Sequence, residues 1–262
     1  METLVNKPLV SIVTPSYNQA RFLEQTILSV LNQSYDHIEY IVIDGGSTDG
    51  SVDILETYAD RIDYWVSEED RGQTDAINKG LERATGEIMA WINSDDTYQP
   101  HAVQEVVAFF NEHPQVGMVY GDANIIDEEG HVIGEFNAQQ TSYRRLRRGG
   151  VYIPQPAAFW RGALWHEVGP LDPSLYFAMD YDLWLRLADI SQLAYHRGHT
   201  WANFRVHGES KTITADARCW DEMLQIHRRD GGRWVSFLVA KYWIRRLLTP
   251  IWIWWRRRKL LK

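Results

Sequence analysis

The sequence predicts an α/β protein with a mostly parallel central sheet and helices on both faces of that sheet. Between residues 9 and 120, short apolar runs rich in Val and Ile alternate with segments whose apolar residues recur at helical spacing. The chain has 262 residues, 45% hydrophobic and 24% charged, a composition that suits a large buried core and excludes a disordered chain.

Five strands are predicted in this half, each an apolar run that ends at turn or polar residues. Leu9–Thr14 is β-branched and stops at Pro15, and Glu39–Ile43 stops at Asp44-Gly45-Gly46. The other three are Ile62–Val66, Glu87–Ile92 and Gly117–Tyr120. Helices are predicted between the strands at Arg21–Leu31, Val52–Tyr58, Thr74–Ala84 and Ala102–Asn111.

The alternation stops after residue 120. A hairpin is predicted at Gly121–Phe136 and a basic loop or short helix at Thr141–Gly150. The later patterns predict a strand at Pro154–Trp160, a helix at Tyr181–Ile190, an extended segment at Leu193–Val206 and a helix at Asp216–Arg229. We expect one domain over residues 1–230, with halves at about 1–120 and 121–230, and a basic amphipathic helical tail over residues 231–262.

Charge is distributed unevenly along the chain. Residues 227–262 carry 11 Lys and Arg residues against one acid, whereas the other 226 residues carry 16 basic and 34 acidic residues, which gives the net charge of −8. The acidic body argues against nucleic-acid binding. The single cysteine, Cys219, excludes an intramolecular disulfide, and neither a signal peptide nor a membrane-spanning helix is expected.

The predicted tail combines tryptophan with basic residues. Its apolar residues recur at helical spacing, at Trp243, Ile244, Leu247, Leu248, Ile251, Trp252 and Trp255, with Trp234 and Trp254 nearby. Arg245, Arg246 and 256–259 fall largely outside that stripe, as in helices that lie on anionic membrane surfaces. The alternative is a helix that packs on its own domain or on a second copy of the chain. Pro250 is expected to kink the helix in either case.

Polar residues collect after four of the predicted strands, at Thr14–Asn18, Asp44–Gly50, Glu68–Gln73 and Asn93–Asp96. Ligands of such sheets bind outside the carboxyl ends of the strands, so these residues are expected to share one crevice. Each segment alone is also an ordinary turn or helix cap.

Five segments together resemble the family 2 glycosyltransferases. They are Ile12–Asn18 (IVTPSYN), Ser29–Ser34 (SVLNQS), Tyr40–Gly50 (YIVIDGGSTDG), Trp91–Asp96 (WINSDD) and Phe177–Arg186 (FAMDYDLWLR). The resemblance covers roughly residues 9–210. It implies a Rossmann-like GT-A fold and the transfer of a sugar from a nucleotide diphosphate of the UDP or dTDP type, with inversion at the anomeric carbon.

The resemblance also implies roles for individual residues. It places Pro15, Tyr17, Asn18, Asp44, Gln73, Asn93 and Asp95 in the nucleotide-sugar pocket. Asn93-Ser94-Asp95 stands where the family has an Asp-x-Asp motif, so Asp95 is expected to bind a divalent metal, Mn²⁺ or Mg²⁺, with His207 as a candidate second ligand. Asp180 matches the family's catalytic base, although Met179 replaces the preceding Glu. Asp96 is a candidate second metal ligand or a helix cap, and the cap is the favoured interpretation.

These observations predict a hexosyltransferase-type enzyme of surface polysaccharide biosynthesis. The expected acceptor is a saccharide or lipid-linked saccharide, and the expected location is cytoplasmic, peripheral on the inner face of the cell membrane. Two alternatives stay open. A sugar-phosphate nucleotidyltransferase would need a Gly-rich basic loop where this chain has Pro15–Gln19, and a non-catalytic saccharide-binding protein could share the fold.

Overall fold

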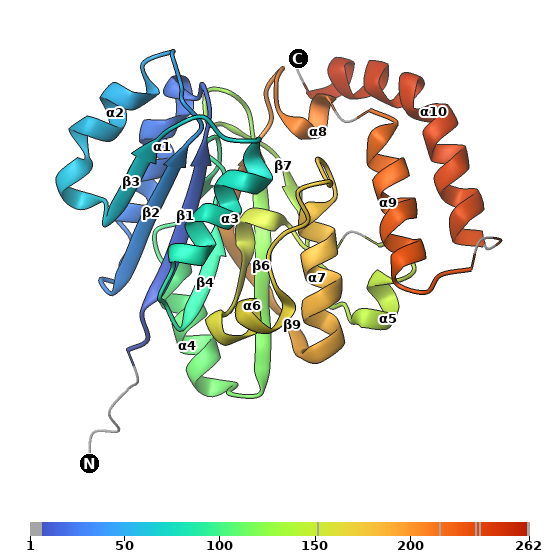
Figure 1. The fold of residues 1–262 in the computed structure, drawn as a ribbon, viewed down its shortest axis with the longest axis horizontal. Helices are drawn as coiled ribbons and strands as arrows, with labels where there is room; N and C mark the ends of the chain where they lie inside the picture. The colour runs from blue at the N-terminus through green and yellow to red at the C-terminus, as the bar shows by residue number, and fades with distance from the viewer. Residues whose placement is uncertain (1–6, 151, 215, 234, 236, 261–262) are drawn as a thin grey trace.

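The computed structural model describes residues 7–150, 152–214, 216–233, 235 and 237–260. Over these residues the chain forms a nine-stranded sheet with helices packed on both faces (Figure 1). The strands follow the order β3-β2-β1-β4-β8-β6-β9-β5, and β7 pairs with β6.

Four parallel strands form the N-terminal part of the sheet, as the sequence predicts. They are β1 (Val10–Ser16), β2 (Ile38–Asp44), β3 (Tyr64–Ser67) and β4 (Ile88–Trp91). The segments between them form α1 (Ala20–Leu31), α2 (Ser51–Thr57), the short turn η1 (Ala59–Arg61) and α3 (Gln73–Arg83). Because the strands are parallel, their carboxyl ends meet at one edge of the sheet.

The strands are buried on both faces. Val13 of β1 packs in an apolar cluster with Ile77 of α3, whereas the preceding Ile12 packs in a second cluster with Leu23 of α1 and Val106 of the helix that follows β5. Successive side chains of a strand point to opposite faces, so a continuous apolar run such as β1 fills both clusters.

The second half of the sheet is mixed. Its elements are β5 (Thr97–Tyr98), α4 (Ala102–Glu112), β6 (Val116–Ile126), β7 (Val132–Phe136), α5 (Tyr143–Leu146), η2 (Gln155–Ala157), β8 (Ala158–Arg161), α6 (Gly162–Val168), α7 (Met179–Ile190) and β9 (Gln192–Arg205). The strand β8 runs antiparallel to both β4 and β6, whereas β9 runs parallel to β6. The predicted hairpin is confirmed as β6 and β7. The mostly parallel arrangement predicted for the whole sheet therefore applies to its N-terminal half.

Three helices follow the sheet, namely α8 (Lys211–Thr214), α9 (Arg218–Arg229) and α10 (Phe237–Leu260). In Figure 1, α9 and α10 lie on the side of the molecule away from β1–β3, and α10 bends so that its C-terminal part runs toward α8. Pro250 lies inside α10. Among the described helices, none has the length and hydropathy needed to cross a bilayer. Trp234 lies outside the described residues.

Candidate active site

A cavity of about 840 Å³ lies at the carboxyl ends of the parallel strands. Its walls come from the loops after β1 to β4, from the start of α3, and from segment 204–211 at the end of β9. The volume falls within the range of small-molecule sites, about 300–1,000 Å³. Six of the predicted residues line it, namely Pro15, Tyr17, Gln73, Asn93, Asp95 and His207.

Asn18 and Asp44 are outside this lining and hold its loops together. The backbone N–H of Asn18 donates to Oγ of Ser47 (2.7 Å), and its side-chain oxygen accepts from the N–H of Thr48 (2.9 Å). The fully buried Asp44 carboxylate accepts from the N–H and the hydroxyl of Ser47 (2.9 and 2.6 Å) and from the hydroxyl of Ser67 (2.7 Å). Both residues therefore fix the loops after β1 and β2, and their direct contact with a donor stays a prediction.

A chain of side-chain amides runs along the cavity. Nε2 of Gln73 donates to Oδ1 of Asn93 (2.7 Å), and Nδ2 of Asn93 donates to Oε1 of Gln155 (3.0 Å). The Asn93 amide is thus engaged through both of its polar atoms. Oε1 of Gln73 is buried and accepts no hydrogen bond from the residues that the structure describes. A buried acceptor without a partner costs about 1–3 kcal/mol.

Asp95 and His207 meet at the cavity from two distant segments. Nε2 of His207 lies 3.0 Å from Oδ2 of Asp95. The imidazole side chain is 5% exposed and packs against Phe22, with ring centroids 4.9 Å apart, whereas the Asp95 side chain is 20% exposed. A carboxylate oxygen and an imidazole nitrogen are both ligands of divalent transition metals, so the pair forms a donor set that fits such an ion.

The interpretation of Asp96 as a helix cap is wrong. The helix α4 begins at Ala102, after the short strand β5, so Asp96 lies too far upstream to cap it. The buried Asp96 carboxylate instead accepts from the backbone N–H of Arg205 (2.8 Å), and burial and the nearby Asp95 carboxylate raise the pKa of Asp96 well above its ordinary value. This contact joins the loop after β4 to the end of β9 and keeps Asp95 near His207.

Asp180 lies in the first turn of α7, where helix N–H groups favour a carboxylate. Its Oδ1 accepts from the N–H of Tyr181 (2.6 Å). Burial raises the pKa of Asp180 to about 6, and the ammonium of Lys211 acts against this shift. Asp180 does not itself line the cavity, but Lys211 and Tyr176 do.

Sequence reasoning assigned no role to Lys211, which follows His207 by four residues. Its Nζ donates to the carbonyl of Tyr176 (2.8 Å) and lies 3.8 Å from the centroid of that ring. Burial lowers the pKa of Lys211 to about 8, while the carboxylates of Asp180 and Asp95 raise it. The ammonium is therefore within electrostatic reach of both the predicted base and the predicted metal ligand. A basic residue shortly after His207 was the signal that could have revealed it.

Glu222 of α9 holds the loop that leads into α7. Its buried carboxylate accepts from the N–H groups of Tyr176 (3.0 Å), Phe177 (2.8 Å) and Ala178 (2.9 Å). Glu222 therefore holds the backbone of the three residues that precede α7, the helix that carries Asp180. No local sequence signal reveals this role, since the carboxylate comes from a different helix.

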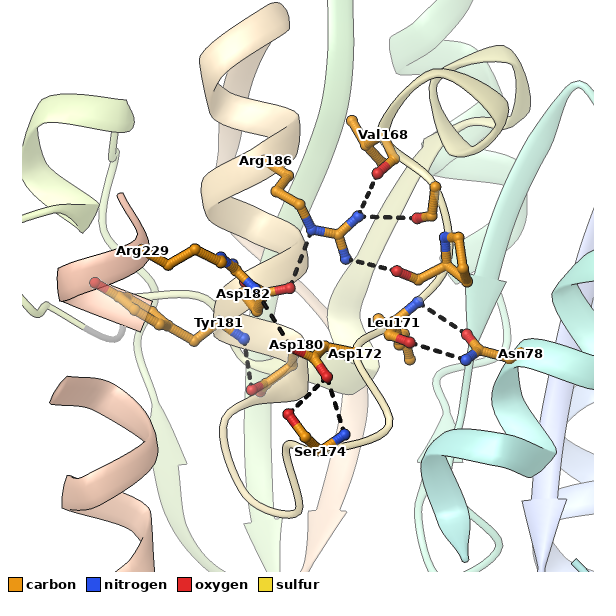
Figure 2. A network of polar contacts seen from close by, with 12 residues as sticks. Asn78, Val168, Leu171, Asp172, Ser174, Asp180, Tyr181, Asp182, Arg186 and Arg229 are labelled. Atoms are coloured by element: carbon orange, nitrogen blue, oxygen red, sulfur yellow. Dashed lines mark hydrogen bonds and ion pairs between the residues drawn. The ribbon is translucent and has the colours of Figure 1, made fainter. Parts of the chain in front are cut away.

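Figure 2 shows how the rest of α7 is anchored. The side chain of Asp182 is almost fully buried and pairs with Arg186 (Nε to Oδ2, 3.0 Å) and with Arg229. Arg186 also donates to the carbonyls of Val168 and Gly169 (2.7 and 2.9 Å). Asp180 and Asp182 thus both lie in α7. Because Asp182 is engaged in ion pairs, Asp180 is favoured as the base.

A second contact in Figure 2 joins α3 to the loop before α7. The Asn78 side chain exchanges two hydrogen bonds of 2.9 Å with the backbone of Leu171. This bridge fixes α7 relative to the cavity, because the first residue of α3, Gln73, lines the cavity.

Comparison with known proteins defines the class. Residues 11–166 match glycosyl transferase family 2, and the match spans more than half of the chain. The chain therefore belongs to this family, which confirms the resemblance identified in the sequence.

Two relatives have informative names. An uncharacterized glycosyltransferase of Rickettsia typhi is 31% identical over 216 residues, which cover 79% of this chain and 67% of the relative. The putative teichuronic acid biosynthesis glycosyltransferase TuaG of Bacillus subtilis is 44% identical over 109 residues, which cover 40% of this chain and 43% of TuaG. The chain thus spans less than half of TuaG.

Two solved structures share the fold. TarS 1–349 of S. aureus, solved with UDP, has a TM-score of 0.69 at 16% identity, covering 91% of this chain and 72% of that one. The mannosyltransferase PcManGT of Pyrobaculum calidifontis, solved with GDP-Man and Mn²⁺, has a TM-score of 0.66 at 18% identity, covering 95% of this chain and 72% of that one. The mixed α/β architecture is therefore the GT-A fold.

Proposed function

We propose that this protein is an inverting glycosyltransferase that moves a hexosyl group from a nucleotide diphosphate sugar to an acceptor hydroxyl. The observation that carries the proposal is a single cavity lined by Asp95, His207 and Lys211, with Asp180 close enough to Lys211 to influence its pKa. These groups serve the two needs of the reaction, which are charge neutralisation on a diphosphate and a carboxylate for the acceptor.

The nucleotide is assigned to the wall formed by Pro15 and Tyr17. The Tyr17 ring is 62% exposed at the cavity, so it can stack on a nucleobase. Gln73 lines the same cavity and is assigned to a hydroxyl of the ribose or the sugar. We propose a UDP or dTDP donor, and the UDP bound in TarS supports this choice. The alternative donor is a guanine nucleotide sugar, because the mannosyltransferase structure contains GDP-Man.

The donor set of Asp95 and His207 fits a divalent metal, Mn²⁺ or Mg²⁺, and the Mn²⁺ in the mannosyltransferase structure supports its use. A bound metal supplies positive charge that stabilises the departing diphosphate. Asp95 and His207 would hold it, and the Lys211 ammonium would donate to diphosphate oxygens from the same side of the cavity.

Asp180 is the proposed base. As the acceptor oxygen forms its bond to the anomeric carbon, Asp180 takes the hydroxyl proton and the bond from that carbon to the diphosphate oxygen breaks. Attack from the face opposite the leaving group inverts the configuration. With a pKa of about 6, the carboxylate is mostly ionised near neutral pH yet remains basic enough to accept a proton.

The proposed acceptor is a saccharide or lipid-linked saccharide in surface polysaccharide biosynthesis. TuaG, a putative teichuronic acid biosynthesis glycosyltransferase, supports this class of pathway. We place the enzyme peripherally on the inner face of the cell membrane, held by its basic C-terminal segment.

The proposal is tested by incubating the protein with a panel of nucleotide sugars, Mn²⁺ and a saccharide acceptor. We expect release of a nucleoside diphosphate together with a glycosylated product of inverted configuration. Pyrophosphate as the product would instead identify a nucleotidyltransferase. Donor binding without any turnover across the panel would indicate a non-catalytic saccharide-binding protein.

A further inference from the structure

The outer side of α10 exposes a continuous set of large apolar side chains. Their exposed fractions range from 40% to 72%, and they are Trp243, Ile244, Leu247, Leu248, Ile251 and Trp254, which we call the apolar face of α10. Large contiguous apolar surfaces on a folded protein mark contact with a partner or a membrane, because leaving them in water is costly.

A different side of α10 packs on the protein. Val239, Tyr242 and Thr249 are buried, and Tyr242 and Thr249 contact Trp220 of α9. With about 3.6 residues per turn, Tyr242 and Thr249 lie on the side of the helix opposite the apolar face, whereas Val239 lies one turn before Trp243 at its edge. The helix therefore packs on its own domain, while Trp243, Ile244, Leu247, Leu248 and Ile251 stay between 40% and 72% exposed.

Basic residues border the apolar face. Lys241 and Arg245 follow one border at helical spacing, and Arg246 follows the other. Arg246 pairs with Asp221 (2.8 Å). Among the described residues, no carboxylate lies within ion-pair distance of Arg245, whose guanidinium instead lies 5.1 Å from the ring centroid of Trp220. The sequence continues with four consecutive basic residues, 256–259.

A crevice of about 150 Å³ opens beside Arg245, between α9 and α10. It is lined by Trp220, Arg245, Thr249 and Trp252. Trp252 is 47% exposed, next to the apolar face. The crevice thus presents a guanidinium that has no carboxylate partner among the described residues and lies beside the indole ring of Trp220, a combination suited to a phosphate group whose attached chains are apolar.

We infer that the apolar face of α10 docks on an anionic lipid bilayer and that a lipid phosphate occupies the crevice at Arg245. A second copy of the chain is a less suitable partner for this face. Two copies paired through it would bring their basic residues close together, and these would repel each other. An anionic bilayer satisfies both features, because acyl chains cover the apolar face while headgroups meet Arg245.

This inference extends the proposed function and rests on it, because docking on a membrane serves a transferase whose acceptor is linked to a lipid. The helix α10 packs against α8, and Lys211 of α8 lines the donor cavity. Figure 1 shows the C-terminal part of α10 next to α8. Docking through α10 would therefore hold the cavity close to the lipid surface, where a lipid-linked acceptor is presented.

The test is co-sedimentation of the full chain with vesicles of phosphatidylcholine alone or with added phosphatidylglycerol. We expect binding to the anionic vesicles and little to the neutral ones. Ile251→Glu should abolish binding, because it places a charge in the apolar face. Arg245→Gln should weaken binding about five-fold. The matched control, Arg144→Gln on the exposed surface of α5, should change it less than about two-fold.

Equal binding to both vesicle types, or equal effects of Arg245→Gln and Arg144→Gln, would overturn the inference. A dimer in solution that Ile251→Glu converts to a monomer, without vesicle binding by the wild type, would assign the face to a second copy instead. Nucleoside diphosphate release with a water-soluble acceptor should be the same in all variants. That readout separates failure of the docking inference from failure of the proposed transferase.

Discussion

Nε2 of His207 lies 3.0 Å from Oδ2 of Asp95, although the two residues are 112 positions apart in the chain. The contact is possible because Asp96 binds the backbone of Arg205 and thereby joins the loop after β4 to the end of β9. Both side chains line the cavity, so the carboxylate and the imidazole face the same space.

The first prediction concerns this pair. Asp95→Asn and His207→Gln should each reduce metal-dependent stabilisation of the protein by UDP, since each removes one ligand from the donor set. The measurement is the thermal shift with UDP, with and without Mn²⁺. The control His166→Gln, at an exposed position on α6, should leave the shift intact. The metal assignment fails if Asp95→Asn retains the full Mn²⁺-dependent shift.

The second prediction is a pH dependence. Because burial raises the pKa of Asp180 to about 6, the base is protonated below that pH, and kcat/KM should fall as pH decreases through about 6. The Lys211 ammonium lowers the pKa of Asp180, so in Lys211→Met the fall in kcat/KM should move to higher pH. A pH–rate profile of both proteins measures the effect. If kcat/KM falls at the same pH in Lys211→Met as in the wild type, the electrostatic link between Lys211 and Asp180 is contradicted.

Titration of Asp180 also affects the free energy of unfolding. Its contribution to stability decreases as pH rises, whereas its contribution to activity increases. A carboxyl whose folded pKa is raised binds its proton more tightly in the folded state, so Asp180 contributes its stabilisation at low pH. That contribution is lost as pH rises from its unfolded pKa of 3.8 to about 6. Asp180→Asn should therefore show a smaller loss of stability across this window than the wild type, as measured by urea unfolding at pH 4 and pH 7.

The third prediction concerns Glu222. Glu222→Ala leaves three N–H groups before α7, one buried and two partly buried, without their acceptor and should destabilise the protein by roughly 2–4 kcal/mol. It should also lower kcat with little change in UDP affinity, because it displaces the helix that carries Asp180. Asp221→Asn, on the exposed side of the same helix, should cost less than about 1 kcal/mol. Equal stabilities of the two variants would argue against this role of Glu222.

The fourth prediction separates the two aspartates of α7. Asp182→Asn removes a buried charge that pairs with Arg186 and Arg229 and should cost about 3 kcal/mol of folding free energy. Denaturant unfolding measures this loss. If Asp182→Asn is as stable as the wild type but inactive, the roles assigned to Asp180 and Asp182 need to be exchanged.

The sequence predicts the N-terminal half of the fold closely. The helix predicted at Arg21–Leu31 spans Ala20–Leu31, and the strand predicted at Glu39–Ile43 spans Ile38–Asp44. The apolar residues of these elements recur at regular spacing, and such spacing can be recognised in the local sequence. The elements β5, α6 and α8 were not predicted, because two to seven residues show too little of any period.

The long-range contacts of the site were harder to predict. The family resemblance indicated Asp95, His207 and Asp180, but the roles of Glu222 and Lys211 depend on how α9 and α8 pack beside α7. The apolar residues of α10 were likewise evident in the sequence. Which of its sides packs inward depends on Tyr242 and Thr249 meeting Trp220, a contact that the spacing of α10 alone does not encode.

The central claim, that Asp180 deprotonates the acceptor in a sugar transfer, is tested most directly with Asp180→Asn. Transfer and UDP affinity are measured together at pH 7.5 with the preferred nucleotide sugar, Mn²⁺ and acceptor. We predict that kcat falls about 10³-fold while UDP binds with wild-type affinity, because the amide cannot accept the proton. Transfer at a wild-type rate by this variant would contradict the account.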